Sequence, residues 1–350
     1  MTTTQHVSST APADWAATID CGTSNTRVRL WHLGVRVRQA ERPVGVRDTV
    51  LTGSRAVLQD AVRGALLAAM SGAGLVEDAP VCVLASGMIT SGAGLLELPH
   101  LAAPAGLAEL AEAMTLRAVD GWWARPVWWV PGVRSQQQPA TLADAEAFDM
   151  MRGEETEVMG LLDRLQQAGE ALLVLPGSHT KLIRLDAQGR IAASATTLGG
   201  ELLQVLSQNT LLAASVGGGF VDQLDLAALD AGAQATWRSG LSRAVFGARI
   251  LDVKGLADRH GRASYLLGAV LAADVQALLH SPTLQLRDRD RPVWVAGRAS
   301  VRDGLVHLLR SAWPQPAAVL PLADDLQDDL AGWGALVLAR HRGLLAPFSV

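Results

Sequence analysis

The pattern of apolar and polar positions repeats one arrangement in two parts of the chain. Residues 16–20 are an apolar run that ends on an acid, and residues 26–33 alternate apolar and polar side chains. Residues 172–175 are again apolar, and two short strand-like runs follow over residues 182–195. Such runs, each separated from the next by a turn, predict a strand, a turn and a second strand in both parts. The pattern therefore predicts two related α/β domains.

Further runs predict the elements that follow these hairpins. Short apolar runs predict strands at Val81–Ala85, Val127–Val130 and Val293–Val295. Apolar residues spaced three and four positions apart predict helices at Ala56–Met70, Leu107–Leu116, Glu154–Ala168, Glu201–Leu212, Ser264–Leu279, Ser300–Arg310 and Gly334–Arg342.

The order of these elements predicts a division near residue 170. We expect a first domain over residues 15–170 and a second over residues 171–350. The sequence leaves open whether the last helix packs back on the first domain. Residues 1–14 are rich in Thr and Ser, without a basic start or an apolar core. This composition is typical of a disordered tail and not of a signal peptide.

Composition excludes several classes of protein. The chain has 350 residues, enough for two domains with cores of their own, and only two cysteines, which is typical of a reducing compartment such as the cytoplasm. The net charge of −4 gives no general footprint for nucleic acid. Two apolar stretches, residues 61–76 and 266–279, are interrupted by Arg63 and Asp274, so neither is expected to span a membrane.

Common catalytic motifs are absent from the sequence. There is no Gly-x-x-x-x-Gly-Lys loop, which excludes P-loop enzymes. There is also no Gly-x-Ser-x-Gly elbow, no Cys-x-x-Cys pair and no His-Glu-x-x-His zinc motif. The candidate chemistry therefore lies in the turns of the two hairpins and in the loops around them.

The first hairpin turn is Asp20-Cys21-Gly22-Thr23-Ser24-Asn25. Glycine lets a backbone approach a phosphate closely, and turn amides and hydroxyls can donate hydrogen bonds to it. A carboxylate at the strand end can hold Mg²⁺ through water. An ordinary hairpin turn explains the same residues equally well, so this turn alone decides nothing.

The second hairpin turn, Pro176-Gly177-Ser178-His179-Thr180-Lys181, has the same layout and adds a compact positive charge. His179 alone is most often a plain turn residue, but the repetition of one design favours a phosphate clamp made from both hairpins.

A third turn, at Gly297, follows the strand at 293–295 and would let a flat base lie against the backbone. Taken alone, it is also an ordinary link between a strand and a helix.

Charged residues gather where the helix at residue 154 begins. Asp149, Arg152, Glu154 and Glu155 lie within seven residues. Acids at a helix start are favoured by the helix dipole, which is a purely structural explanation. The functional interpretation is a proton acceptor beside an arginine that grips a carboxylate in bidentate fashion. Two further loops, 85–91 and 196–201, follow strands and are candidates for the same site.

Taken together, these segments resemble the 2-dehydro-3-deoxygalactonokinase family. The resemblance covers about residues 15–345 and rests on Asp20–Asn25, Ser86-Gly87-Met88, Val130-Pro131-Gly132, Met151–Thr156, Pro176–Lys181 and Gly200-Glu201-Leu202, in the family's order. It implies two ribonuclease-H-like domains around an interdomain nucleotide cleft, as in the sugar kinase, actin and hsp70 superfamily. The implied reaction is ATP-dependent phosphorylation of the 6-hydroxyl of 2-dehydro-3-deoxy-D-galactonate in galactonate catabolism.

The resemblance also implies a role for each candidate residue. Asp20 would position Mg²⁺, and the catalytic set would be Glu154, Asp20 and Glu155, with Glu154 favoured over Glu155 and Asp149 as the proton acceptor. Arg152 would pair with the substrate carboxylate, and the other substrate-binding residues would be Gly87, Met88 and Glu201. The residues expected to bind ATP are Gly22, Thr23, Ser24, Asn25, Gly177, Ser178, His179, Thr180, Lys181 and Gly297.

Three positions depart from the family pattern. Cys21 stands where the family usually has Trp, Gly199 where it commonly has Thr, and Arg298 where a small polar residue is usual. A kinase for a related 2-keto-3-deoxy sugar acid is therefore one alternative, and an actin-like or hsp70-like assembly protein is another. The expected partners are ATP and a small sugar acid, with no nucleic acid and no membrane, and a homodimer is left open.

Overall fold

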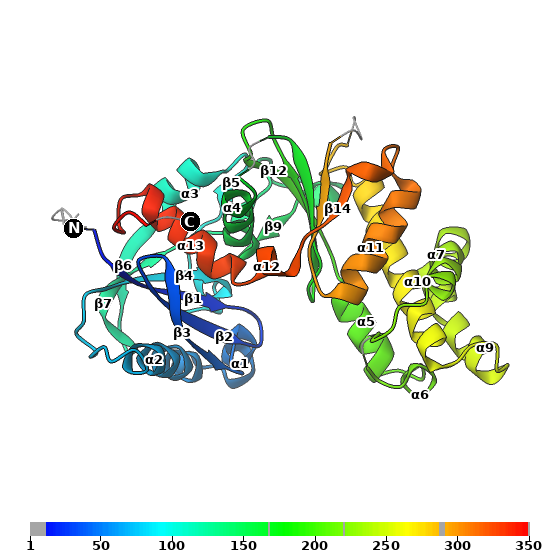
Figure 1. The fold of residues 1–350 in the computed structure, drawn as a ribbon, viewed down its shortest axis with the longest axis horizontal. Coiled ribbons are helices and arrows are strands. Elements are labelled where there is room, and N and C mark those ends of the chain that lie inside the picture. The colour runs from blue at the N-terminus through cyan, green and yellow to red at the C-terminus, as the bar shows by residue number, and fades with distance from the viewer. Residues whose placement is uncertain (1–11, 167–168, 220, 287–290, 349–350) are drawn as a thin grey trace. The chain divides into compact units, whose positions relative to one another are not determined.

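The computed structural model describes residues 12–166, 169–219, 221–286 and 291–348, and these divide into two compact units (Figure 1). Unit 1 comprises Met1–Val133, Met151–Gln167 and Asp329–Val350, and unit 2 comprises Arg134–Met150 and Ala168–Asp328. The predicted division near residue 170 differs from these units in residues 134–150, which pack with unit 2. The last helix packs with unit 1, the arrangement that the sequence left open, because its apolar side chains are buried there.

Unit 1 is built on a six-stranded sheet with the order β3-β2-β1-β4-β7-β6. Strands β1 and β2 are antiparallel, whereas β4 runs parallel to β1 and β7 parallel to β4. The strands are β1 (Trp15–Cys21), β2 (Thr26–His32), β3 (Val35–Arg42), β4 (Val81–Gly87), β6 (Thr115–Val119) and β7 (Trp123–Trp129). Three shorter strands, β5 (Leu101–Ala102), β8 (Val133–Arg134) and β9 (Met150–Met151), form a separate small sheet.

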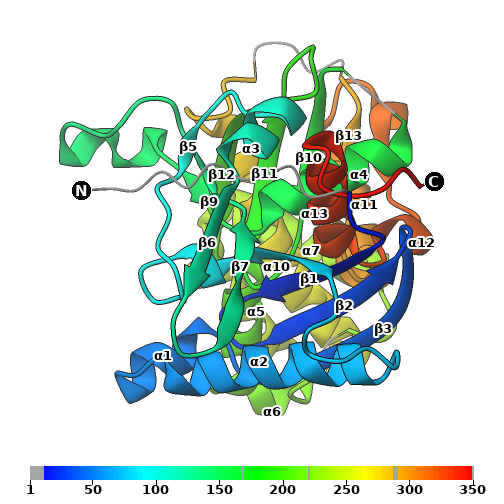
Figure 2. The same cartoon turned by 90° about the vertical axis from the view of Figure 1, so that its left-hand side faces the viewer.

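Helices cover both faces of the unit 1 sheet, as Figure 2 shows for α2 (Ala56–Ser71) on one face and α13 (Leu330–His341) on the other. Alternation along β1 explains this: Ile19 is buried in one core with Leu58 and Leu66 of α2, while Thr18 faces α13. The helix α4 (Glu154–Leu165) packs against α13. The remaining helices of the unit are α1 (Val46–Thr52), α3 (Leu107–Ala113) and the short 3₁₀ turn η1 (Met88–Thr90).

Unit 2 repeats the same strand order in a five-stranded sheet, β12-β11-β10-β13-β14. Its first three strands are again an antiparallel meander, and β13 and β14 again run parallel to the first strand. The strands are β10 (Ala171–Leu175), β11 (Thr180–Leu185), β12 (Ile191–Thr197), β13 (Val293–Val295) and β14 (Val319–Pro321). The repeated order shows that the two hairpins recognised in the sequence open two versions of one α/β unit.

The core of unit 2 lies between one face of its sheet and a long helix, α10 (Arg259–His280). Around α10 lie α5 (Gly199–Gln208), α6 (Ala213–Val216), α7 (Leu226–Ser239), α8 (Leu241–Val245), α9 (Gly247–Val253) and α11 (Ala299–Ala312), with α12 (Asp324–Gln327) and the 3₁₀ turns η2 (Leu142–Ala147) and η3 (Pro316–Ala318) elsewhere in the unit. Within the described residues, α10 is the one helix long and apolar enough to cross a membrane, and 67% of its most apolar window is buried in the structure. This burial is typical of a core helix.

The elements differ from the predicted ones mainly at their ends. The helix predicted over 107–116 ends at Ala113, because Thr115 begins strand β6, and the helix predicted over 201–212 begins at Gly199 and ends at Gln208. Strand β3 was not predicted, since most of its side chains are exposed and half of them are charged. The predicted helix end at Ala168 lies outside the described residues. So do residues 1–11, which are most of the predicted tail. Within the rest of that tail, Ala13 forms an isolated β-bridge with Leu345.

Candidate active site

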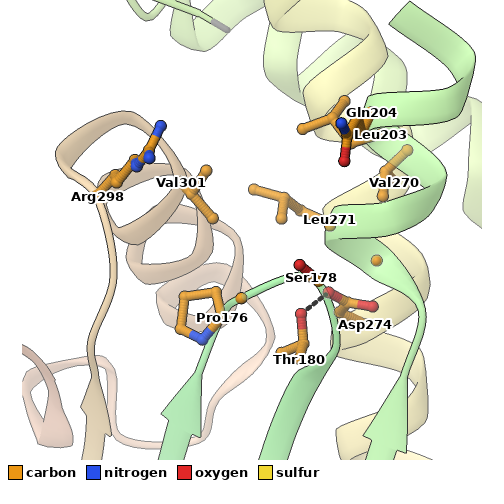
Figure 3. Close-up of a pocket in the computed structure, with 13 residues that line it drawn as sticks. Pro176, Ser178, Thr180, Leu203, Gln204, Val270, Leu271, Asp274, Arg298 and Val301 are labelled. Carbon is orange, nitrogen blue, oxygen red and sulfur yellow. Dashed lines mark hydrogen bonds between the residues drawn. The ribbon is translucent and has the colours of Figure 1, made fainter. Parts of the chain in front are cut away.

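The turn between β10 and β11 forms one wall of a cavity of about 210 Å³ in unit 2 (Figure 3). The turn spans residues 176–179, and the other walls come from the starts of α5 and α11 and from the middle of α10. The lining residues are Pro176, Gly177, Ser178, Thr180, Gly199, Gly200, Leu203, Gln204, Val270, Leu271, Asp274, Arg298 and Val301. The cavity thus has a polar side at the turn and an apolar side between the helices.

The turn and the start of α5 touch each other through glycines. A Cβ on Gly200 would overlap with the carbonyl oxygen of Gly177, so only glycine permits this approach. The backbone N–H of Glu201 donates to the carbonyl oxygen of Ser178 at 2.8 Å. The first turn of α5 therefore lies beside the β10–β11 turn, and a helix N-terminus in this position favours an anion.

Within the polar side of the cavity, Ser178 and Thr180 differ in what their hydroxyls do. The hydroxyl of Thr180 donates to Oδ2 of Asp274 at 2.9 Å, so its proton is already engaged. The hydroxyl of Ser178 has no hydrogen-bond partner among the described side chains, and Ser178 lines the cavity. Of these two predicted phosphate-binding hydroxyls, Ser178 is the one that can donate to a ligand.

Asp274 was not predicted as a site residue. Its side chain is only 3% exposed, and burial raises its pKa although Thr197 and Thr180 both donate hydrogen bonds to it. In the sequence it was visible only as a single acid inside an apolar helix, which is the one signal that could have pointed to it. A buried acid costs free energy unless it is hydrogen-bonded, so it marks a polar contact within the core.

Lys181 lies on the opposite side of β11 from Thr180, because successive residues of a strand point to opposite faces. Lys181 is 6% exposed, and its ammonium group donates to the carbonyl oxygen of Met150 at 2.8 Å and to Oγ1 of Thr196 at 2.7 Å. Thr196 in turn donates to the carboxylate of Asp149 at 2.8 Å. Lys181 is therefore held by these hydrogen bonds and does not line the cavity.

Two other predicted residues of unit 2 lie at the edge of this region. Nε2 of His179 and a carboxylate oxygen of Glu201 are 3.2 Å apart, and both side chains are exposed. Gly297 has φ +105°, and its N–H donates to Oε1 of Gln327 at 2.6 Å. A Cβ at Gly297 would overlap with the ring of Pro176, so this glycine supports the wall that its neighbour Arg298 lines.

In unit 1, the β1–β2 turn is fixed by backbone hydrogen bonds. The N–H of Gly22 donates to the carbonyl oxygen of Asn25 at 2.9 Å, and the N–H of Arg47 in α1 donates to that of Thr23 at 2.9 Å. The side chains of Thr23 and Asn25 are exposed, and that of Ser24 is half-buried. The turn is thus preorganised, and its hydroxyl and amide groups remain accessible.

Asp20 is the penultimate residue of β1 and lies close to the end of β4. A Cβ on Gly87, which has φ +85°, would lie 3.4 Å from Oδ1 of Asp20, and one on Gly153 would lie 3.4 Å from the Cα of Gly87. The predicted residues Asp20, Gly87 and the start of α4 are therefore brought together in unit 1. Burial raises the pKa of Asp20, and the positive charges of Arg29 and Arg27 oppose this shift.

Arg152, just before α4, is oriented by groups of unit 1. Its guanidinium donates to Oγ1 of Thr90 at 2.9 Å and to the carbonyl oxygen of Leu98 at 2.5 Å, and it lies 3.4 Å from Nδ1 of His100. A guanidinium has five N–H donors, so these contacts leave donors for a ligand. Met88 follows Gly87 at the start of the 3₁₀ turn that carries Thr90.

The two predicted catalytic glutamates of α4 have different surroundings. Glu155 is 0% exposed, and its carboxylate accepts hydrogen bonds of 2.9 and 2.8 Å from the N–H of Gly153, so it closes the start of its own helix. Burial and the charge of Glu154 raise its pKa to about 8. Glu154 is half-buried at the first position of α4. The structure thus gives Glu155 a local structural contact at the start of its own helix.

Glu157 was missed by the sequence interpretation, although it lies three residues after Glu154 and hence on the same helix face. Burial raises its pKa to about 8, and the charges of Glu154 and Asp20 add to this shift. Asp20, Glu154 and Glu157 therefore share one electrostatic environment. The spacing Glu-x-x-Glu at a helix start was the available signal.

The raised pKa of Glu157 predicts how stability depends on pH. The folded protein keeps a proton on Glu157 up to about pH 8, whereas the unfolded chain releases it near 4.5, so stability is lost as the pH rises through this range. We expect Glu157→Gln to raise the melting temperature at pH 8.5 by about 2–4 °C and to change it little at pH 4.5. Calorimetric melting at both pH values checks this, with Glu112→Gln at an exposed site as the control. An equal effect of the two variants at both pH values would contradict it.

The described residues fit a magnesium ion held by few protein ligands. No group of three or more His, Cys, Asp or Glu side chains suited to a metal occurs in the part of the chain that the structure describes. Mg²⁺ bound with a nucleotide usually takes one or two carboxylates, several waters and phosphate oxygens. Asp20, which lies beside an accessible turn, fits this pattern.

The comparison with protein families shows which family the chain belongs to. A sequence profile of the 2-keto-3-deoxy-galactonokinase family matches residues 20–320. The chain belongs to this family. The match includes both hairpin turns, the start of α4 and Gly297. The predicted family and the predicted activity, phosphorylation of 2-dehydro-3-deoxy-galactonate in galactonate catabolism, are therefore confirmed. Sugar kinases of this fold use ATP.

Solved structures confirm the predicted fold. A protein of Sinorhizobium meliloti, provisionally assigned as a 2-dehydro-3-deoxygalactonokinase, superimposes with a TM-score of 0.71 at 23% identity and covers 93% of this chain and 98% of its own. Component A of the (R)-2-hydroxyglutaryl-CoA dehydratase of Acidaminococcus fermentans gives a TM-score of 0.50 at 12% identity, over 95% and 99% of the two chains. No curated relative matches the sequence. The two α/β units of this galactonokinase-family chain thus have the ribonuclease-H-like fold.

Proposed function

We propose that this chain transfers the γ-phosphoryl group of ATP to the 6-hydroxyl of 2-dehydro-3-deoxy-D-galactonate, with the nucleotide bound in the cavity of unit 2 and the sugar acid at the start of α4. The observation that carries the proposal is the contact of the β10–β11 turn with the first turn of α5. It places a glycine turn, an available serine hydroxyl and a helix N-terminus around one cavity. These are the groups that bind phosphate without a P-loop.

The nucleotide-binding residues divide into those that contact it and those that support its site. Gly177 and Ser178 would donate to phosphate oxygens, together with the N–H of Gly200 at the start of α5. The apolar side chains of Leu203, Leu271 and Val301 line the remaining wall and would hold a flat base. Thr180, Lys181 and Gly297 would act by fixing the turn and the wall, since their polar groups are engaged within unit 2.

In unit 1, the β1–β2 turn would add phosphate contacts through Thr23, Ser24 and Asn25, and Asp20 would hold Mg²⁺ through water. A bound Mg²⁺ would neutralise charge on the phosphates, which phosphoryl transfer requires besides positioning. Asp20 is suited to this because it is a half-buried carboxylate at the end of a strand, where its position is fixed.

The sugar acid would be held and activated by residues around the start of α4. Arg152 would pair with the carboxylate of the substrate, and the backbone at Gly87 and Met88 would contact the sugar chain, with Glu201 as a further hydrogen-bond acceptor for its hydroxyls. Glu154 would accept the proton of the 6-hydroxyl. Positioning supplies most of the rate in such reactions, so the proton acceptor contributes only part of it.

Arg152→Lys tests the substrate part of this assignment. Lysine keeps the charge but cannot hold Thr90, Leu98 and a carboxylate with one planar group. We expect the KM for the sugar acid to rise about 30-fold, while the KM for ATP stays within about twofold. Steady-state kinetics with each substrate varied in turn measure both values. A larger rise in the KM for ATP than in that for the sugar acid would remove Arg152 from the substrate site.

A coupled assay of ADP release tests the proposed function. The purified chain is assayed with Mg²⁺ and ATP against a panel of 2-keto-3-deoxy sugar acids that includes the galactonate and gluconate epimers. ADP release that requires the acid and is fastest with the galactonate compound supports the proposal. Faster turnover of the gluconate epimer would assign the chain to a related sugar acid, and release independent of any acid would favour the actin-like or hsp70-like alternative.

We assign the reaction to the cytoplasm. The assignment is supported by the two cysteines, Cys21 and Cys82, which are unpaired and whose pKa values burial raises to about 12. Thiols of this kind are inert and match a reducing compartment.

A further inference from the structure

Asp274 is a buried carboxylate in the wall of the unit 2 cavity, and the proposed function gives it no role so far. It lies in the middle of α10, on the side of the helix that faces the β11–β12 hairpin and the start of α5. Among the described residues, its hydrogen bonds come from two threonines and from no cationic side chain. A carboxylate placed beside a phosphate site without a positive partner needs a function of its own, because its charge disfavours an anion nearby.

The two threonines that hold Asp274 are opposite each other in the sheet. Thr180 begins β11, Thr197 ends β12, and they form the last pair of that ladder. Oγ1 of Thr180 donates to Oδ2 of Asp274 at 2.9 Å, and Oγ1 of Thr197 donates to Oδ1 at 2.6 Å. One carboxylate therefore ties the open end of the hairpin to the core helix, and both of its oxygens are used.

The same carboxylate also occupies the space beside the start of α5. A Cβ on Gly199 would overlap with the carboxylate oxygens of Asp274, so this position has room for glycine only. Gly199 is the first residue of α5, and the next residue packs directly on the carbonyl oxygen of Gly177. Asp274 thus contacts both pieces of backbone that form the phosphate side of the cavity.

We propose that Asp274 is a positioning residue for the nucleotide phosphates: it fixes the β10–β11 turn and the first turn of α5 at the spacing that a phosphate requires, and Gly199 is its obligatory partner. The identity of the ligand rests on the proposed function, whereas the geometry around Asp274 does not depend on it. It accounts for Gly199 in place of the hydroxyl residue common in the family, because the Asp274 carboxylate fills the place where that side chain would lie. It also makes Thr180 a support and Ser178 the hydroxyl that contacts phosphate.

The test compares Asp274→Ala, Asp274→Asn, Gly199→Ala and the double variant Asp274→Ala/Gly199→Ala with the wild type. Hydrogen exchange is measured without nucleotide, and affinity for ATP by titration calorimetry. We expect Asp274→Ala to speed amide exchange in residues 177–181 and 199–202 about tenfold, with the α10 segment around Leu267 unchanged, and to weaken ATP binding about tenfold. Asp274→Asn should stay within about threefold, since threonine hydroxyls can accept from an amide as well as donate to one.

Gly199→Ala should weaken ATP binding about as much as Asp274→Ala, because the new methyl group displaces the carboxylate. The double variant should be no weaker than the worse single variant, since removal of the carboxylate makes room for the methyl group. Kinetically, the KM for ATP should rise while the KM for the sugar acid does not. Asp222→Ala, at an exposed acid of the same unit, is the matched control and should change none of these values.

Several results would overturn the inference. The first is amide exchange in Asp274→Ala that is unchanged, or that is faster throughout unit 2. The second is a loss of ATP affinity in the double variant that equals the sum of the losses in the two single variants. The others are equal rises in the KM values for ATP and for the sugar acid, and a wild-type chain that binds no ATP. Failure of the proposed function looks different: a wild-type chain that binds ATP, loses affinity on Asp274→Ala, and phosphorylates none of the sugar acids leaves the role of Asp274 in place and removes the assigned acceptor.

Discussion

Replacing Asp20 by Asn is expected to lower kcat about 10³-fold while leaving the fold intact. Asparagine has the same size, so the end of β1 and its contacts with Gly87 should persist. It lacks the charge needed to hold Mg²⁺ through water, and a metal ion supplies several kcal/mol of transition-state stabilisation. Initial rates at saturating ATP and sugar acid, measured over a wide range of Mg²⁺ concentration, give this effect.

Asp60→Asn, at an exposed site of the same unit, is the matched control and should retain full activity. Melting curves of both variants separate lost chemistry from lost structure. Because burial disfavours the charged form of Asp20, the Asn variant should melt at the same temperature as the wild type or slightly above it at neutral pH. Full kinase activity of Asp20→Asn under saturating Mg²⁺ and ATP would show that the metal assignment is wrong.

Glu154→Gln is expected to have the second large effect, a fall in kcat of about 10²–10³-fold with both KM values within about threefold. Glutamine keeps the hydrogen-bonding shape at the first position of α4 but cannot take the proton of the 6-hydroxyl. Single-turnover rates at saturating ATP and sugar acid measure the size of the loss.

Glu155→Gln provides the comparison within the same helix start. Its carboxylate accepts from the N–H of Gly153 and so serves the start of its own helix, and this variant should lower kcat far less than Glu154→Gln does. If Glu155→Gln lowered kcat as much as Glu154→Gln or more, the proton acceptor would have to be reassigned. Asp149 is a weaker candidate, because its carboxylate accepts hydrogen bonds from Thr196 of unit 2.

Local patterns were sufficient to predict the elements that carry the site. The hairpins β1–β2 and β10–β11 and the start of α4 lie where the sequence placed them, because glycines and a run of acids mark these turns and the helix start. The repetition of one strand order in both units was also foreseen in outline. These features depend on neighbours in the sequence, which is why the sequence alone reveals them.

Contacts between distant residues could not be predicted in the same way. Asp274 meets Thr180 and Thr197 only because α10 packs across the hairpin, and a period of 3.6 residues does not show which element a lone acid will face. Lys181 was expected at the phosphates, but the alternation along β11 directs it to the opposite face from Thr180. The sequence identifies candidate residues, whereas the packing of the helices and strands determines which residues they contact.

The three departures from the family pattern are explained by local packing. Cys21 is fully buried in the core of unit 1, with a pKa raised to about 12, so it serves as a small apolar residue. Gly199 is required by the carboxylate of Asp274. Arg298 precedes α11 and lines the unit 2 cavity, where its charge would favour a phosphorylated ligand. None of the three removes a group that the proposed reaction needs.

The position of the transferred phosphate tests the account most directly. The wild-type chain is incubated with Mg²⁺, ATP and 2-dehydro-3-deoxy-D-galactonate, and the product is examined by ³¹P-coupled proton NMR. The account predicts one phosphate ester whose phosphorus couples to the two protons on C6, formed in equal amount to ADP. A phosphate on another hydroxyl, or ADP formed without any phosphorylated acid, would contradict it.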